Sequence, residues 1–287
     1  MRWLERWRAR AGATPAGVAD RMAAAYEAAS RGDYQAALGI WGPLARAGVP
    51  RAQNNVGACF AEGLGLNADQ NLAARWLSLA AEAGDPVGQR NLAALYFKGA
   101  AVEQDYAHAA ALYRAAASAG DGPAQDMLSW MLVEGEVMAP DYPEARRWAL
   151  AAAEQGMASA MTRLGMMFHN ALGVPRDPAQ AVHWWRRGAQ HGDADGQAML
   201  GAALHLGTGV SRDPVMALAW LLRARDAGSA LAAPFLGPAR NALSAAQITE
   251  AQRRAVALQS SEVGCDHRNG GSHRSRQDRA GAGAHRR

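Results

Sequence analysis

The stretch from Leu164 to Gly192, LGMMFHNALGVPRDPAQAVHWWRRGAQHG, decides the fold because most of its pattern returns thirty-six residues later. The segment from Leu200 to Gly228, LGAALHLGTGVSRDPVMALAWLLRARDAG, again has Leu-Gly at its start, then Gly-Val, Asp-Pro and Trp, and Gly at its end. A constant step of this size is typical of a stacked repeat, in which each unit packs mainly against its neighbours.

Three residue types keep the same step over most of the chain. The sequence predicts that the glycines end helices, because glycine readily adopts positive φ, and that the aspartates cap the helices that follow. The glycines are Gly48, Gly84, Gly120, Gly156, Gly192 and Gly228. The aspartates are Asp33, Asp69, Asp105, Asp141, Asp177 and Asp213. The alanines are Ala37, Ala73, Ala109, Ala145, Ala181 and Ala217.

Each full unit predicts two helices. In the unit 52–87, small or apolar residues recur at helical spacing before Gly63, and again after Asp69. The pattern predicts one short unit (18–51), five full units (52–87, 88–123, 124–159, 160–195 and 196–231) and a capping helix that starts after Ser244 and ends near Leu258. The expected fold class is all-α, a right-handed superhelix of about six helix-turn-helix repeats.

One large residue recurs in the predicted second helix of each full unit, as Trp76, Leu112, Trp148, Trp184 and Trp220. Its register predicts that it fills the core of its repeat. Trp184 is followed by a second tryptophan, Trp185, which the same register predicts to point away from the core.

The two ends of the chain differ from the repeats. Residues 1–17 place Trp3 and Trp7 among arginines, which predicts a basic amphipathic helix that caps the first repeat or lies on an anionic membrane surface. Residues 259–287 are rich in Gly, Ser, Arg and His and predict a disordered basic tail, since they have little apolar surface to bury. The repeat array and its capping helix then occupy residues 18–258.

Composition excludes several classes of protein. A net charge of +4 is a weak argument for specific nucleic-acid binding. Cys59 and Cys265 have no paired spacing for a disulfide framework or a zinc site, and no apolar stretch approaches the ~20 residues of a membrane-spanning helix. The N-terminus lacks a signal peptide's apolar region. We therefore expect a cytoplasmic protein, with peripheral membrane association through the N-terminal helix left open.

No motif in the sequence indicates catalysis. A phosphate-binding glycine loop, a nucleophile elbow and metal-spaced histidines are all absent. His169 and His205 hold equivalent positions in adjacent repeats, but no further ligand keeps that register, so we expect them to face solvent. The sequence predicts a protein that is not an enzyme and has no catalytic residue, cofactor or metal.

At Leu164-Gly165, Phe168, Gly173-Val174, Asp177, Ala181, Trp184 and Gly192 the chain resembles the Sel-one-like repeats, relatives of the tetratricopeptide repeat. The resemblance implies an adaptor that holds partners together. A cysteine-rich branch of the family has paired cysteines and is associated with β-lactam binding or hydrolysis. Cys59 stands alone in this array, so the pairing that marks that branch is missing.

By analogy with tetratricopeptide repeats, the first helix of each unit is expected to line a concave groove. A few apolar anchors among charges would suit an extended or helical peptide. The predicted groove residues are Asn54, Arg90, Phe97, Lys98, Asp126, Trp130, Met166, His169 and His205.

The sequence thus predicts a non-enzymatic adaptor that binds a protein or peptide in this groove. Two alternatives remain at this stage. One is a β-lactam-binding or hydrolytic relative of the cysteine-rich branch, and the other is an envelope-associated scaffold attached through the N-terminal helix.

Overall fold

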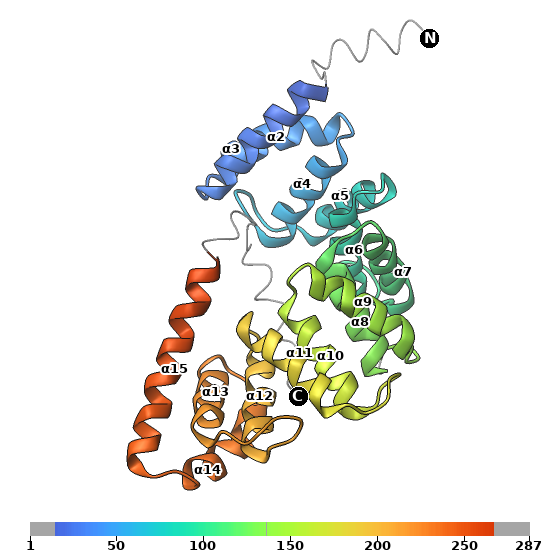
Figure 1. The fold of residues 1–287 in the computed structure, drawn as a ribbon. Helices are drawn as coiled ribbons and strands as arrows, with labels where there is room; N and C mark the ends of the chain where they lie inside the picture. Colours follow the sequence, from blue (N-terminus) through green and yellow to red (C-terminus); the bar gives the residue numbers. More distant parts are fainter. Residues whose placement is uncertain (1–14, 136, 267–287) are drawn as a thin grey trace, which may run out of the picture. The chain divides into compact units, whose positions relative to one another are not determined.

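The protein is built from helices in tandem. The computed structural model describes residues 15–135 and 137–266, and every regular element among them is helical (Figure 1). The all-α prediction is therefore confirmed. Most of the predicted N-terminal helix (1–17) and residues 267–287 of the predicted basic tail lie outside the described residues. The chain divides into two compact units, Met1–Ala160 and Met161–Arg287, which we call unit 1 and unit 2.

The described residues of unit 1 form four complete helix pairs and the start of a fifth. The pairs are α2 (Pro15–Ser30) with α3 (Tyr34–Arg46), α4 (Pro50–Glu62) with α5 (Gln70–Glu82), α6 (Pro86–Lys98) with α7 (Tyr106–Ser118), and α8 (Gly122–Glu134) with α9 (Tyr142–Glu154). Helix α10 (Ala158–Asn170) begins at the end of unit 1 and continues into unit 2. From α2 to α9, each helix packs on the next along the chain, as the repeat predicts.

Unit 2 continues the pattern and then departs from it. It contains α11 (Pro178–Gln190), α12 (Ala194–Leu206) and α13 (Pro214–Asp226), followed by a 3₁₀ turn (Ala230–Ala232), α14 (Ala233–Asn241) and α15 (Ala245–Asp266). Helix α15 packs against α13 and buries Ala251 and Ala255. It begins with the predicted cap, since the Ser244 and Gln247 side chains each accept a hydrogen bond from the other residue's backbone N–H.

The predicted end of the repeat array at Leu258 falls inside a helix. Helix α15 runs to Asp266, so residues 259–266, assigned from composition to the disordered tail, continue the helix. The physical reason is local: this segment, SSEVGCD after Gln259, contains no proline, and a helix already started and packed is extended at little cost.

The periodic glycines and aspartates act as predicted. The side-chain carboxylate of each periodic aspartate accepts a hydrogen bond of 2.9–3.0 Å from a backbone N–H in the first turn of the helix that follows. Every periodic glycine has φ between 80° and 89°, the left-handed conformation that ends a helix without a Cβ clash. The second helix of each pair therefore starts and stops at positions that the sequence specifies.

Small residues let the two helices of a pair approach closely. All six periodic alanines are fully buried. A Cβ added at Gly57 would lie 2.9 Å from Leu77 Cγ, and one added at Gly201 would lie 2.8 Å from Leu221 Cγ. Both distances are shorter than carbon atoms tolerate, so the bare backbone of the first helix contacts a side chain of the second.

The Trp184–Trp185 pair is placed the other way round from the prediction. Trp185 is 2% exposed and lies in the core of unit 2, whereas Trp184 is half-exposed beneath the guanidinium of Arg187, 4.6 Å from the ring centroid. The reason is Gly165 on α10, where a side chain would occupy the space that the Trp185 indole fills. The prediction that Trp184 is the core residue was wrong.

The position equivalent to Trp185 fills the core in the other repeats as well. The residue that follows the recurring large one is at most 4% exposed throughout, as Leu77, Tyr113, Ala149 and Leu221. Trp148 and Trp220 are also buried, so the predicted position contributes to the core in some repeats but does not define it.

A charged cluster joins the second helices of two repeats in unit 1. Arg114 on α7 donates from Nε and Nη2 to the two carboxylate oxygens of Glu144 on α9, both at 2.9 Å. The indole of Trp148 donates to Glu144 at 3.0 Å. The Arg114 hydrogen bonds, with that of Trp148, lower the pKa of Glu144 from 4.5 to about 2, so the carboxylate stays ionised well into the acid range.

We predict that Gly165→Ala destabilises the protein by roughly 1–3 kcal/mol, because the new methyl group collides with Trp185. The matched control is Gly237→Ala on α14, where no heavy atom lies within 4 Å of the added Cβ. That change should be neutral or stabilising by about 0.5–1 kcal/mol. Urea unfolding followed by circular dichroism measures both, and equal midpoints for the two variants would contradict the close-approach argument.

We predict that Glu144→Gln lowers the free energy of unfolding at pH 7 by about 1–2 kcal/mol, the modest value reflecting an Arg114 side chain that is 41% exposed. A carboxylate whose folded pKa is depressed stabilises the fold above its unfolded pKa. This contribution should disappear as the pH falls from 4.5 to about 2. Thermal unfolding across that window measures it, with Glu154→Gln at the exposed end of the same helix as control. A deficit that persists unchanged at pH 2 would refute the assignment.

Candidate partner-binding surface

Three aromatic rings meet on the first-helix side of unit 1. Phe97 at the end of α6 packs edge-on against Tyr106 at the start of α7 and Trp130 on α8, with ring centroids 5.2 and 5.9 Å apart. All three side chains are half-buried, and the exposed Lys98 follows Phe97. We call Phe97, Tyr106 and Trp130 the aromatic cluster. It brings together two predicted groove residues and leaves part of each ring exposed to solvent.

Tyr106 was not among the predicted groove residues. Its position in the repeat is also occupied by Tyr34 and Tyr142, so the thirty-six-residue step contained a signal for it. The step alone did not show that the first residue of a second helix lies against the end of the preceding first helix, because this contact depends on how the loop between them closes.

The cluster is specific to one place in the array. At the position of Trp130, the two preceding repeats carry Ala58 and Ala94. At the position of Phe97, the flanking repeats carry Ala61 and Val133. The same two helices agree at scaffold positions, where Leu92 is equivalent to Leu128 and Gln89 to Gln125. The large rings are therefore a local addition to the repeat.

The predicted groove residues Asn54, Arg90 and Asp126 stand thirty-six residues apart on successive first helices, and each contacts a neighbouring repeat. The amide of Asn91 donates to Asn54 Oδ1 at 2.8 Å, and the Ser159 hydroxyl donates to Asp126 Oδ2 at 2.6 Å. Arg90 forms an ion pair with Asp121, with 3.1 Å between Nε and Oδ1. These polar groups therefore hold neighbouring first helices together in unit 1.

Several carboxylates in this region have two roles. Asp85 caps α6 through the Gly88 N–H and also accepts from Arg51 Nε at 2.8 Å. In unit 2, Asp193 caps α12 through Gly196 and accepts from the Thr162 hydroxyl at 2.6 Å. Burial raises the pKa of Asp193, although the Thr162 hydrogen bond acts in the opposite direction. One side chain thus starts a helix and binds the previous repeat.

A periodic glutamine is a further link that sequence reasoning missed. The side-chain amides of Gln53, Gln89, Gln125 and Gln197 each donate to a carbonyl eight residues earlier, at 3.0–3.5 Å. The acceptors lie near the C-termini of the preceding second helices, at Ala45, Ala81, Ala117 and Ala189. The thirty-six-residue step could have revealed this row, whose role is to satisfy carbonyls at helix ends.

In unit 2, the remaining predicted residues contact the core. Met166 is half-buried and packs against the cluster that contains Trp185. The ring of His169 lies 5.3 Å from that of Trp185. Both His169 and His205 are half-buried rather than solvent-facing, and neither Nδ1 has a hydrogen-bond partner among the described residues.

The described residues contain no group of three or more His, Cys, Asp or Glu side chains that could hold a metal ion. Cys59 is 2% exposed, and burial raises the pKa of its thiol to about 11. Such a thiol stays protonated at neutral pH and is a poor nucleophile. Within the described part of the chain, no helix combines the length and the apolarity that crossing a membrane requires.

Comparison with solved structures supports the fold. A Sel1 repeat protein from Oxalobacter formigenes is 29% identical and superimposes with a TM-score of 0.71, over 76% of this chain and 86% of that chain. Immunity protein Pa5087 from Pseudomonas aeruginosa is 19% identical over 76% of this chain and 82% of its own, with a TM-score of 0.42. The antigen c5321 from uropathogenic Escherichia coli is 22% identical over 84% and 68%, with a TM-score of 0.41. These last two scores are too low to support an argument.

A search of curated proteins gave no significant match. The family model described as Sel1 repeat matches five consecutive segments, 50–85, 86–121, 122–157, 158–193 and 194–229. Each segment holds one first helix and one second helix of the structure, from α4 to α13. The matches cover well over half of the chain and confirm the Sel-one-like resemblance, and this protein belongs to the Sel1 repeat family.

Proposed function

We propose that this protein is a non-enzymatic adaptor that binds a protein or peptide segment on the first-helix side of unit 1, centred on the aromatic cluster. Sel1 repeat proteins generally act as protein-interaction scaffolds. The observation that carries the proposal is the half-exposed Phe97–Trp130 pair, which stands where the other repeats of unit 1 have alanine or valine.

The chemistry of the cluster suggests what it binds. Half-exposed aromatic rings offer a large apolar area at a low cost in side-chain entropy, and tryptophan and tyrosine are common binding hot spots. Lys98, the residue after Phe97, is exposed and supplies a positive charge. The favoured partner segment therefore has an apolar side chain that covers the rings and an acidic residue next to it.

The other predicted groove residues have different parts in this proposal. Arg90, Asn54 and Asp126 hold the first helices in register through their contacts with the next repeat, and so position the cluster. Substituting Arg90 would leave the Asp121 carboxylate, which is 8% exposed, without its ion pair. In unit 2, Met166, His169 and His205 remain proposed partner contacts on the first helices of that unit.

The test is quantitative affinity capture from cell extract with wild type and variants. We predict that Trp130→Ala lowers recovery of the specific partner by roughly tenfold or more, as expected for a hot-spot residue worth ~2 kcal/mol, and that Lys98→Glu weakens binding less. The matched control is Trp184→Ala, which removes a half-exposed tryptophan from a second helix in unit 2 and should leave recovery unchanged.

Far-UV circular dichroism and a thermal unfolding curve establish that each variant is folded. If the Phe97→Ala, Trp130→Ala double variant is folded and still recovers every partner at the wild-type level, the aromatic cluster is not the binding surface. Equal losses for Trp130→Ala and Trp184→Ala would also contradict the proposal.

A further inference from the structure

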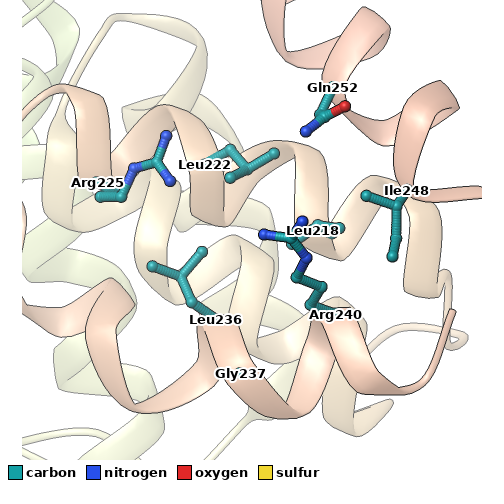
Figure 2. Close-up of a pocket in the computed structure, with 8 residues that line it drawn as sticks. All are labelled: Leu218, Leu222, Arg225, Leu236, Gly237, Arg240, Ile248 and Gln252. Carbon is teal, nitrogen blue, oxygen red and sulfur yellow. The ribbon is translucent and has the colours of Figure 1, made fainter. Parts of the chain in front are cut away.

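A second candidate site lies in unit 2, outside the surface discussed above. Helices α13, α14 and α15 enclose a pocket of about 220 Å³ (Figure 2). Helices α14 and α15 come after residue 229, where the last Sel1 repeat match ends. Two of the three walls therefore lie in the C-terminal cap, outside the matched repeats.

The floor of the pocket is aliphatic. It is lined by Leu218 and Leu222 from α13, Leu236 from α14 and Ile248 from α15. Leu218 is 1% exposed and belongs to the core of the cap, while the other three are partly buried. The pocket is smaller than the ~300–1,000 Å³ typical of drug-sized ligands. Its size and lining suit a single apolar side chain with a small polar group attached.

Three polar side chains stand around this floor. Arg225 comes from α13, Arg240 from α14 and Gln252 from α15 (Figure 2). The Arg240 side chain is exposed and has no ion pair or hydrogen bond with any described residue. No acidic residue lines the pocket. Its charge is therefore complementary to an anion.

Arg225 is already paired, but weakly. It contacts its neighbour Asp226 at 2.7 Å, in an ion pair whose side chains are 55% and 61% exposed. Exposed pairs of this kind contribute little free energy, so a carboxylate held between two guanidinium groups can compete for Arg225. Arg240 remains the main positive group of the site.

We propose that this pocket binds the free C-terminus of a partner polypeptide whose last residue is aliphatic. The terminal carboxylate pairs with Arg240 and Arg225, and the last side chain enters the aliphatic floor. Gln252 is placed to hydrogen-bond the peptide's last amide. A C-terminal residue fits because its carboxylate and side chain leave the same Cα, so both reach a small pocket without the main chain crossing it. An internal acidic residue puts its charge and a neighbouring aliphatic group on different residues.

The experiment uses the full chain and fluorescein-labelled hexapeptides, followed by fluorescence anisotropy. The probe series ends in leucine, isoleucine, valine or phenylalanine with a free carboxylate. Three comparison peptides are a C-terminal amide of the leucine peptide, a free acid that ends in glycine, and an amide that carries an internal glutamate. We expect a free-acid aliphatic peptide to bind, and each comparison peptide to bind roughly tenfold or more weakly.

Arg240→Glu should weaken binding of the free acid by roughly tenfold or more, since it reverses the main charge of the site. The matched control is Arg253→Glu on α15, which makes the same charge change at a residue that is 75% exposed and outside the pocket. It should change affinity less than twofold. Thermal unfolding shows whether both variants are folded, and a salt titration of the wild type provides a second measurement should either fail.

Several results would overturn the proposal. They are no binding of any free-acid peptide below about 1 mM, equal binding of acid and amide, equal binding of the internal-glutamate amide, or no effect of Arg240→Glu in a folded variant. The site does not depend on the aromatic cluster, because no residue of the cluster lies in unit 2. Trp130→Ala should leave peptide binding unchanged, so the two proposals can fail separately.

Discussion

The structure depends on how closely the two helices of each pair approach. Six fully buried alanines and a glycine in several first helices remove the side chains that would hold the helices apart. A side chain from the second helix then fills the space, as Leu77, Trp185 or Leu221. A thin pair of this kind buries little apolar area by itself. It gains stability by packing against the pairs before and after it, which is the physical basis of a repeat array.

Polar contacts between repeats follow from the close packing of these helix pairs. Because first helices of neighbouring repeats lie close together, the aspartate that caps one helix is within reach of a side chain on the previous one, as with Asp85 and Arg51. The buried carboxylates are satisfied twice, by backbone N–H groups and by a side chain, which offsets the cost of removing them from water. Much of the polar first-helix row that resembles a binding groove is thereby used in building the array.

Positions that are needed neither for the close packing of helices nor for helix capping are available for function. The aromatic cluster in unit 1 and the arginine-rimmed pocket in unit 2 are both additions to the repeat, one inside the matched repeats and the other in the cap that follows them. They differ in chemistry, since one is an open aromatic surface and the other a small aliphatic pocket with positive charge. The two proposals together describe an adaptor that holds two unlike segments.

The sequence by itself determined the all-α repeat, the start and end of each second helix, and the capping roles of Asp33, Asp69 and their equivalents. These features depend on local backbone chemistry, which a single residue at a fixed step can specify. Only the tertiary structure decided that Trp185 and not Trp184 is buried, that Arg90 pairs with Asp121, and that Tyr106 joins Phe97 and Trp130. Such contacts depend on the rotation of each helix about its axis. They also depend on where the facing helix has a glycine in place of a side chain. Periodicity locates the buried residue of a helix only to within one position. For Trp184 and Trp185, that one position separates the surface from the core.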